Sequence, residues 1–246
     1  MMIYPAIHYT MGGIWVDYDL QTTIPGLYAI GEANYSDHGG NRLGASALMQ
    51  GLADGYFILP ITIGDYLSKK FAEPKTDVNT KEFIEAEKAV QERIDRLFAI
   101  NGTKTVDSIH KKLGNIMWDY VGMARDEKGL KKAIKDIQEL KEDFYKNVKV
   151  PGSQYEFNQE LEKALRLEDF FEIGELMARD ALNREESCGG HFRVESQTEE
   201  GEAKRDDEHF MYVAAWEYKG EGVEPELHKE PLKYEFIEVK TRNYKE

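Results

Sequence analysis

The chain has 246 residues, of which 32% are charged, and its formal net charge is −14 at pH 7. A nucleic-acid-binding surface needs clustered Lys and Arg, so this acidity argues against a nucleic-acid-binding protein. The single cysteine, Cys188, excludes an intrachain disulfide. The longest apolar run, 56–63, is shorter than a membrane-spanning helix and contains Pro60. We find no signal peptide pattern, and we expect any association with a membrane to depend on a partner.

The segment from His8 to Leu48 brings together a histidine, an arginine, a Gly-Glu pair and several glycines, whereas most of the remaining chain has the composition of charged helix. Residues 14–17 and 27–30 are apolar and β-prone, which predicts two short strands. Gly44 to about Lys70 is predicted to be a helix that is kinked or broken near Pro60. A polar linker at 73–80 is the candidate boundary of this part.

Apolar residues then recur at helical spacing, which predicts an antiparallel bundle of three or four helices between Thr80 and Asn183. Each helix is expected to turn one stripe inward. The stripes are Phe83, Glu87, Val90, Ile94 and Leu97; Ile109, Leu113, Ile116, Tyr120 and Ala124; Leu130, Ile134, Ile137, Leu140 and Phe144; and Leu161, Leu165, Phe170, Ile173, Leu176 and Met177.

The remaining residues form a tail of different composition. Turns dominate 184–196, and 198–208 is charged and predicted to be an exposed loop. Aromatic and β-branched residues at 210–218 and 232–239 predict two strands, with 220–231 as the loop between them.

Four motifs lie in order along the chain: HYTMGG from His8, GLYAIGE from Gly26, HGGNRLG from His38 and EESCGGHFR from Glu185. Together they resemble the flavoprotein subunit of succinate dehydrogenase and fumarate reductase. The Gly-x-Gly-x-x-Gly motif that opens such flavoproteins is missing from this chain. We therefore expect the chain to be the C-terminal part of a longer subunit, started at an added methionine.

The predicted fold class is mainly α (α+β): an antiparallel helical bundle between an N-terminal partial flavin-domain segment and a C-terminal segment with short strands. The predicted domains are 1–73, the C-terminal piece of the FAD-binding domain; 80–183, the helical bundle; and 184–246, the turn-rich and β-strand tail.

The resemblance implies that His8 and Arg42 bind the substrate, a four-carbon dicarboxylate. His8 would donate a hydrogen bond to one carboxylate, and Arg42 would hold the other with its planar, permanently charged fork. No catalytic residue is expected in this chain, because the proton-transferring arginine of the family lies upstream.

The resemblance also implies FAD as the cofactor, bound by Glu32 through a hydroxyl group and by Ala47 and Leu48 at a helix start. The N–H groups of a helix start carry partial positive charge, which would face the pyrimidine side of the flavin. The family commonly has Ser-Leu here, so Ala47 can offer only a backbone contact. His38 is interpreted as a residue that positions its loop.

No metal site is expected. Asp17, Asp19 and Asp37 form no ligand pattern with a histidine, and Cys188 with His191 is a single ligand pair. Cys188 stands where the family commonly has arginine. We interpret its turn as structural, tying the bundle to the flavin domain.

The function implied for the full-length parent is hydride transfer between succinate or fumarate and FAD. Electrons would pass to an iron–sulfur subunit and then to quinone, with a cytochrome b-type membrane anchor as a further partner. The parent is expected in the cytoplasm, peripheral on the inner face of the cell membrane. L-aspartate oxidase is an alternative that shares these motifs, although the long tail favours the respiratory subunit.

A second alternative is a non-catalytic helical subunit-docking module. Whichever parent is correct, we expect the isolated chain to be colourless, inactive, stably helical and without FAD, and able to pair as a homodimer through its exposed apolar surface.

Overall fold

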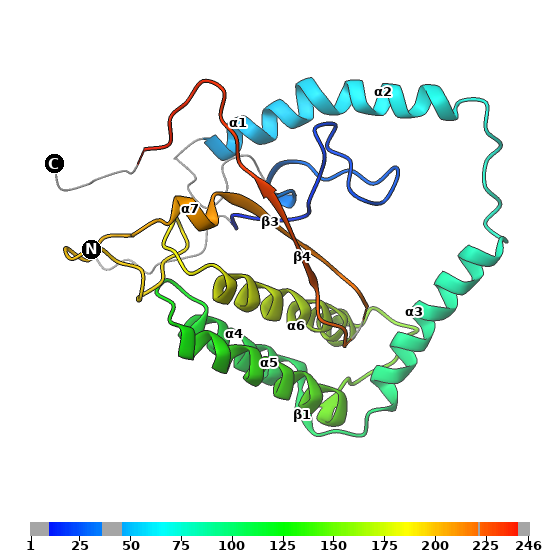
Figure 1. Ribbon diagram of the computed structural model, residues 1–246. Helices are drawn as coiled ribbons and strands as arrows, with labels where there is room; N and C mark the ends of the chain where they lie inside the picture. The colour runs from blue at the N-terminus through cyan, green and yellow to red at the C-terminus, as the bar shows by residue number, and fades with distance from the viewer. Residues whose placement is uncertain (1–9, 36–45, 221, 241–246) are drawn as a thin grey trace, which may run out of the picture. The chain divides into compact units, whose positions relative to one another are not determined.

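The computed structural model describes residues 10–35, 46–220 and 222–240. The chain divides into two compact units. The first unit contains 1–73, 186–192 and 196–246, and the second contains 74–185 and 193–195. The first unit thus combines the beginning and the end of the chain, and the predicted fold class, mainly helical with few short strands, is confirmed (Figure 1).

The second unit is the helical bundle. Its elements are α3 (Lys81–Ala99), β1 (Lys104–Thr105), α4 (Val106–Tyr120), α5 (Glu127–Asn147), β2 (Val148–Lys149) and α6 (Gln159–Asn183). The two-residue strands β1 and β2 pair in parallel. Because β1 precedes α4 and β2 follows α5, this pairing places the start of α4 beside the end of α5, as antiparallel helices require.

Three helices of the bundle begin at a capping side chain. Thr105 accepts a hydrogen bond from the backbone N–H of Ser108, Asp126 from Gly129 and Asn158 from Leu161. Each contact satisfies an N–H group that lacks a partner within the helix, which fixes where the helix begins.

The stripes predicted for α4 and α5 largely hold. Leu130, Ile137 and Phe144 are fully buried, and Ile109 and Leu113 are buried beside them. Ile116 is half-buried and packs against both buried clusters of the bundle. The inclusion of Ala124 was wrong, because α4 ends at Tyr120 and Ala124 is exposed.

The stripe predicted for α3 is mostly wrong. Phe83 and Val90 are exposed, and Leu97 near the end of the helix is the residue that α3 buries. This end is held to α6 by charge as well: Arg93 and Arg96 both pair with the buried carboxylate of Glu168. Only the last turns of α3 reach the core, so the earlier apolar residues have no surface to cover.

The face predicted for α6 is correct only at its beginning, where Leu161 and Leu165 are partly buried and pack against the core. Phe170, Ile173 and Met177 are exposed, whereas Leu167, Phe171, Gly174, Ala178 and Ala181 are buried. The larger apolar residues suggested the wrong stripe. Small residues occupy the buried face because α6 packs closely on its neighbours: a Cβ on Gly174 would lie 3.2 Å from the sulfur of Met117.

The first unit contains η1 (Gly31–Ala33, a 3-10 turn), α1 (Ser46–Ala53), η2 (Asp54–Ile58, a π-helical turn), α2 (Leu59–Lys70), α7 (Asp207–Phe210), β3 (Tyr212–Glu217) and β4 (Glu226–Pro231). The strands predicted at 14–17 and 27–30 are reduced to single bridges, Ile14 with Asn34 and Gln21 with Tyr28. The chain turns between these bridges, which interrupts the strand pairing. In one such turn the side chain of Asp17 accepts hydrogen bonds from the N–H groups of Asp19 and Gln21.

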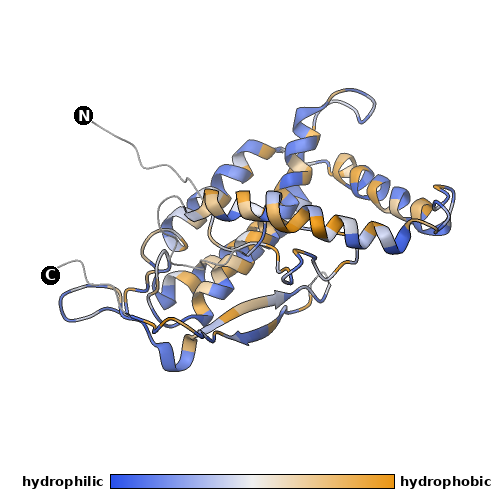
Figure 2. Cartoon of the chain, turned by 90° about the horizontal axis from the view of Figure 1, so that it is seen from above, coloured by the Kyte–Doolittle hydropathy of each residue, from blue (hydrophilic) through white to orange (hydrophobic). Residues whose placement is uncertain are grey.

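The helix predicted to kink or break near Pro60 instead widens just before it. Proline has no N–H to donate and its ring crowds the preceding turn. The π-helical turn η2 accommodates this with a bond from the N–H of Leu59 to the carbonyl of Asp54, and α1, η2 and α2 run on without a gap. This helix is largely apolar in Figure 2. Its exposed apolar residues are Leu48, Met49, Leu52, Tyr56, Phe57, Ile61, Ile63 and Leu67.

In the tail, β3 and β4 form an antiparallel hairpin in which Glu217 lies opposite Glu226 and Tyr212 opposite Pro231. The first strand was predicted, but the second is 226–231, within the predicted loop, and 232–239 is not a strand. The sequence ELHKEP is polar because a two-stranded ribbon exposes most of it, so enrichment in aromatic residues pointed to the wrong segment. In the described part of the chain, no helix has both the length and the apolar composition needed to cross a membrane.

Candidate functional site

Glu32 lies in the turn η1, directly after Gly31, whose φ of +60° favours glycine. The side chain of Glu32 is exposed, and its Oε1 accepts a hydrogen bond from the N–H of Thr10 at 2.8 Å. The Glu32 carboxylate is therefore at the surface and also holds the backbone at Thr10, two residues after His8 in the sequence.

Close backbone packing surrounds this turn. Ile14 donates to the carbonyl of Ala33 and accepts from the N–H of Tyr35, each at 2.9 Å. A Cβ on Gly13 would lie 2.5 Å from the carbonyl oxygen of Asn34, so only glycine fits there. Residues 10–16 therefore pack directly against the turn that contains Glu32.

Helix α1 lies against the same turn. Ala47 is buried at 7% exposure, whereas Leu48 is 74% exposed. Gly31 and Gly51 face each other at this contact: a Cβ on Gly31 would lie 3.8 Å from the Cα of Gly51, which is an ordinary van der Waals distance. Glu32, Ala47 and Leu48, the predicted cofactor residues, thus belong to elements that contact each other.

A buried polar network that the sequence did not reveal joins these elements. Asp54, at 5% exposure, accepts at Oδ2 from the N–H of Gly31 at 3.0 Å and from the amides of Asn34 and Gln50 at 3.2 Å. Gln50 Nε2 also donates to Asn34 Oδ1 at 2.9 Å, and Gln50 Oε1 is buried with no hydrogen-bond partner among the described residues. The feature of the sequence that could have indicated this network is Asp54 itself, an acidic residue four positions after Gln50 in a largely apolar stretch.

The predicted substrate residues His8 and Arg42, and the loop residue His38, lie outside the described residues. Their roles therefore stay predictions from sequence.

The turn that contains Cys188 and His191 is closed by two backbone hydrogen bonds between these residues. Just before it, Glu186 accepts from the N–H of Asp206 at 2.9 Å, within the first unit. Cys188 is half-buried, and as the single cysteine of the sequence it forms no intrachain disulfide.

Two arginines cap helix ends in the second unit. Arg193, at 4% exposure, donates to the carbonyls of Ala181, Leu182 and Arg184 at 3.0, 3.2 and 3.3 Å, at the end of α6. Arg125 donates to two carbonyls after α4, and burial lowers its pKa. These cations satisfy carbonyls that a helix leaves unpaired and complement the negative end of its dipole.

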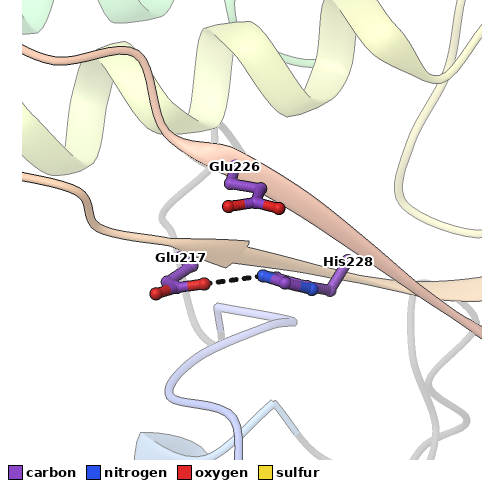
Figure 3. A group of neighbouring side chains, drawn as sticks. All are labelled: Glu217, Glu226 and His228. Carbon is purple, nitrogen blue, oxygen red and sulfur yellow. Dashed lines mark hydrogen bonds and ion pairs between the residues drawn. The ribbon is translucent and has the colours of Figure 1, made fainter.

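One group in the described part of the chain has the residue types of a metal site: Glu217, Glu226 and His228 on the β3–β4 hairpin (Figure 3). All three are exposed, and His228 Nε2 lies 2.8 Å from Glu217. Lys219 pairs with Glu217 and Glu226 at 3.1 and 3.0 Å. Hydrogen bonds from His228 and Lys219 lower the pKa of Glu217. The lysine thus supplies the positive charge that two facing carboxylates need.

Comparison with known proteins gives consistent matches along the chain. Residues 110–244 match the family described as "Fumarate reductase flavoprotein C-term", and residues 1–48 match "FAD binding domain". The succinate dehydrogenase flavoprotein subunit of Bacillus subtilis is 30% identical over 99% of this chain and 40% of its own length. The fumarate reductase flavoprotein subunit of Haemophilus influenzae is 31% identical over 93% of this chain and 36% of its own length.

Solved structures agree. A quinol fumarate reductase structure from Escherichia coli superposes with a TM-score of 0.78 at 28% identity, over 95% of this chain and 38% of that one. The Sdh1 complex of Mycobacterium smegmatis gives 0.77 at 29% identity, over 92% of this chain and 36% of that one. The chain thus spans 36–40% of the length of these relatives. With the C-terminal family matched over more than half of its residues, the chain belongs to the flavoprotein family of succinate dehydrogenase and fumarate reductase.

Proposed function

We propose that the chain is the C-terminal part of a flavoprotein subunit that interconverts succinate and fumarate. The observation that carries this proposal is the similarity to succinate dehydrogenase and fumarate reductase flavoprotein subunits along nearly the whole chain. The four motifs that the sequence shares with this family include both proposed substrate residues.

In this proposal His8 and Arg42 hold the two carboxylates of the dicarboxylate. Arg42 matches one carboxylate with two parallel N–H groups, and His8 donates to the other. Two contacts at opposite ends of a short diacid fix its orientation as well as its position. That orientation is the contribution of these residues to the rate.

The described residues fit FAD as the cofactor. The Glu32 carboxylate is exposed and able to accept from a hydroxyl group, and the Gly31–Gly51 approach leaves backbone free of side chains. The N–H groups at the start of α1, around Ala47 and Leu48, favour negative charge. When bound, the flavin supplies the hydride chemistry, and the protein orients the substrate and stabilises charge.

The proposed partners are an iron–sulfur subunit and a cytochrome b-type membrane anchor. Solved relatives described as quinol-fumarate reductase and Sdh complexes support a membrane-associated assembly. We propose that the subunit is cytoplasmic and sits peripherally on the inner face of the membrane, held by these partners.

Replacing Arg42 with lysine tests the substrate site. The shorter ammonium side chain would keep the charge but lose the paired donors, so succinate turnover in the full-length subunit should fall at least tenfold while FAD stays bound. His8→Ala should raise the KM for succinate more than it lowers flavin content. The measurements are succinate oxidation with an artificial acceptor and flavin absorbance per protein.

The control is Arg166→Lys, since Arg166 is an exposed residue of α6 paired with Glu162. It should leave both readings unchanged. Unchanged turnover and substrate affinity in the Arg42→Lys protein would remove Arg42 from the substrate site. Turnover of L-aspartate in place of succinate would favour the L-aspartate oxidase alternative. A full-length protein without flavin would leave only a docking module.

A further inference from the structure

Asp54 is a buried acid in an apolar helix. It is the sole acidic residue in 46–63, and its side chain is 5% exposed. Its three described partners are one backbone N–H and two side-chain amides, all bonded to Oδ2. Burying a carboxylate without a cation is costly unless such hydrogen bonds compensate for the lost water. An apolar residue would fill this position in a helix that needed only packing.

The carboxylate joins both proposed cofactor elements. On one side it accepts from Gly31, the residue before Glu32, at 3.0 Å. On the other side it accepts from Gln50 in α1, one turn after Ala47, at 3.2 Å. Gln50 Nε2 lies 3.5 Å from the carbonyl oxygen of Gly31. Asp54 and Gln50 together therefore contact the backbone N–H and the backbone carbonyl of Gly31.

The backbone at Asp54 is unusual as well. Asp54 begins the π-helical turn η2, and its carbonyl accepts from the N–H of Leu59. A π-helical turn contains an extra residue, which shifts the residues that follow it around the helix. Asp54 therefore lies where α1 passes into the widened turn, with its side chain bonded to η1 and its carbonyl bonded to Leu59 at the end of that turn.

We infer that Asp54 is a positioning residue for FAD. Its carboxylate holds the Glu32 turn and the first turn of α1 in the mutual arrangement that the flavin needs. This inference rests on the proposed function, because it takes Glu32 and the start of α1 as the cofactor contacts. Asp54 itself does not touch the cofactor, and it acts through Gly31 and Gln50.

The test uses the full-length subunit stripped of FAD and titrated with FAD, with flavin fluorescence as the readout. Asp54→Ala removes the shared acceptor, so the Kd for FAD should rise roughly tenfold to a hundredfold. The flavin midpoint potential should also become more negative, since a displaced helix start stabilises the anionic reduced flavin less. Asp54→Asn keeps an oxygen where Oδ2 lies and should restore part of both properties.

The matched control is Asp65→Ala, an exposed acid on α2, which should change neither the Kd nor the potential. Thermal unfolding followed by circular dichroism accompanies each variant. If Asp54→Ala does not fold, Asp54→Asn decides, because its shape is nearly that of aspartate.

Three outcomes separate the possibilities. A raised Kd and a shifted potential in folded variants support the inference. A wild-type Kd and potential in folded Asp54→Ala, or in Asp54→Asn when Asp54→Ala does not fold, overturn it and leave Asp54 a purely structural residue. A wild-type protein that binds no FAD overturns the proposed function, and this inference falls with it.

Discussion

The two units bury apolar surface in different ways. The second unit has a continuous core in which Leu97, Ile109, Ile137, Phe144 and Phe171 are buried at 0–1% exposure. In the N-terminal part of the first unit, the buried apolar cluster is Val16, Leu20 and Ala29, with Tyr35, Ile58 and Leu59 against it. That part depends on turns, glycine contacts and the Asp54 network, while its longest helix exposes many apolar residues.

The unit with the large apolar core and the unit with the proposed cofactor contacts are therefore different parts of one chain. A bundle with its own core has the means to stay folded by itself. The first unit carries the proposed cofactor contacts on elements held mainly by polar groups. The predictions below measure how far this division holds.

The largest expected effect is in the bundle core. Ile137→Ala should lower the free energy of unfolding by about 2–5 kcal/mol, because it removes buried methyl groups and leaves a cavity. Chemical denaturation followed by circular dichroism measures this. Ile173→Ala, on the exposed face of α6, is the control and should change it far less. Equal losses from both variants would contradict the observed face of α6.

A smaller effect is expected at the end of α6. Arg193→Met should cost about 1.5–3 kcal/mol, because the carbonyls at this helix end lose a charged donor. Arg166→Met is the control, since its exposed pair with Glu162 should contribute at most about 0.5 kcal/mol. Both values come from the same denaturation experiment. If the two variants lost equal stability, Arg193 would be no more important than a surface arginine.

The smallest effect is expected in the first unit, at the start of α7. The Asp206 carboxylate lies 2.9 Å from His209 Nδ1 and raises the pKa of His209, while His209 lowers the pKa of Asp206. The histidine contribution to stability is complete below its unfolded pKa of about 6.5 and disappears as pH rises through the raised folded value. The aspartate contribution is present above about pH 3.9 and disappears as pH falls through the lowered folded value.

Asp206→Asn should therefore bring the His209 titration, followed by NMR, down toward its unfolded value. Asp107→Asn, in the second unit, is the control and should leave that titration where it is. A His209 pKa unaffected by Asp206→Asn would show that the pair does not persist in solution.

Sequence periodicity predicted the existence of every bundle helix but not every buried face. The α5 stripe was correct because large apolar residues fill its core positions. In α6 the buried face includes Gly174, Ala178 and Ala181, which weigh little in a hydrophobicity pattern yet allow close packing. In α3 the pattern could not show that only the end near Leu97 meets the core. Strand β4 is polar, so its pairing with β3 left no apolar signal.

The family motifs identified the candidate site, but not how it is held together. Glu32 and Ala47 were recognised from local sequence, whereas the Asp54 network depends on residues 20 and 23 positions apart. Such contacts exist only after the turn and the helix have come together. Gly31 had a local explanation as a turn residue, and its close approach to Gly51 emerged only from the packing.

The first unit is discontinuous, since its parts lie on both sides of the bundle in sequence. A ribosome that adds about 5–20 residues per second delivers the tail on the order of ten seconds after the N-terminal segment. The bundle is dominated by contacts between consecutive helices, so it can fold during that interval. The N-terminal segment completes its unit only after the tail has been made, and the apolar residues of α1 and α2 that are exposed in the structure are exposed throughout this interval too. During synthesis this segment is the part of the chain that most needs a chaperone.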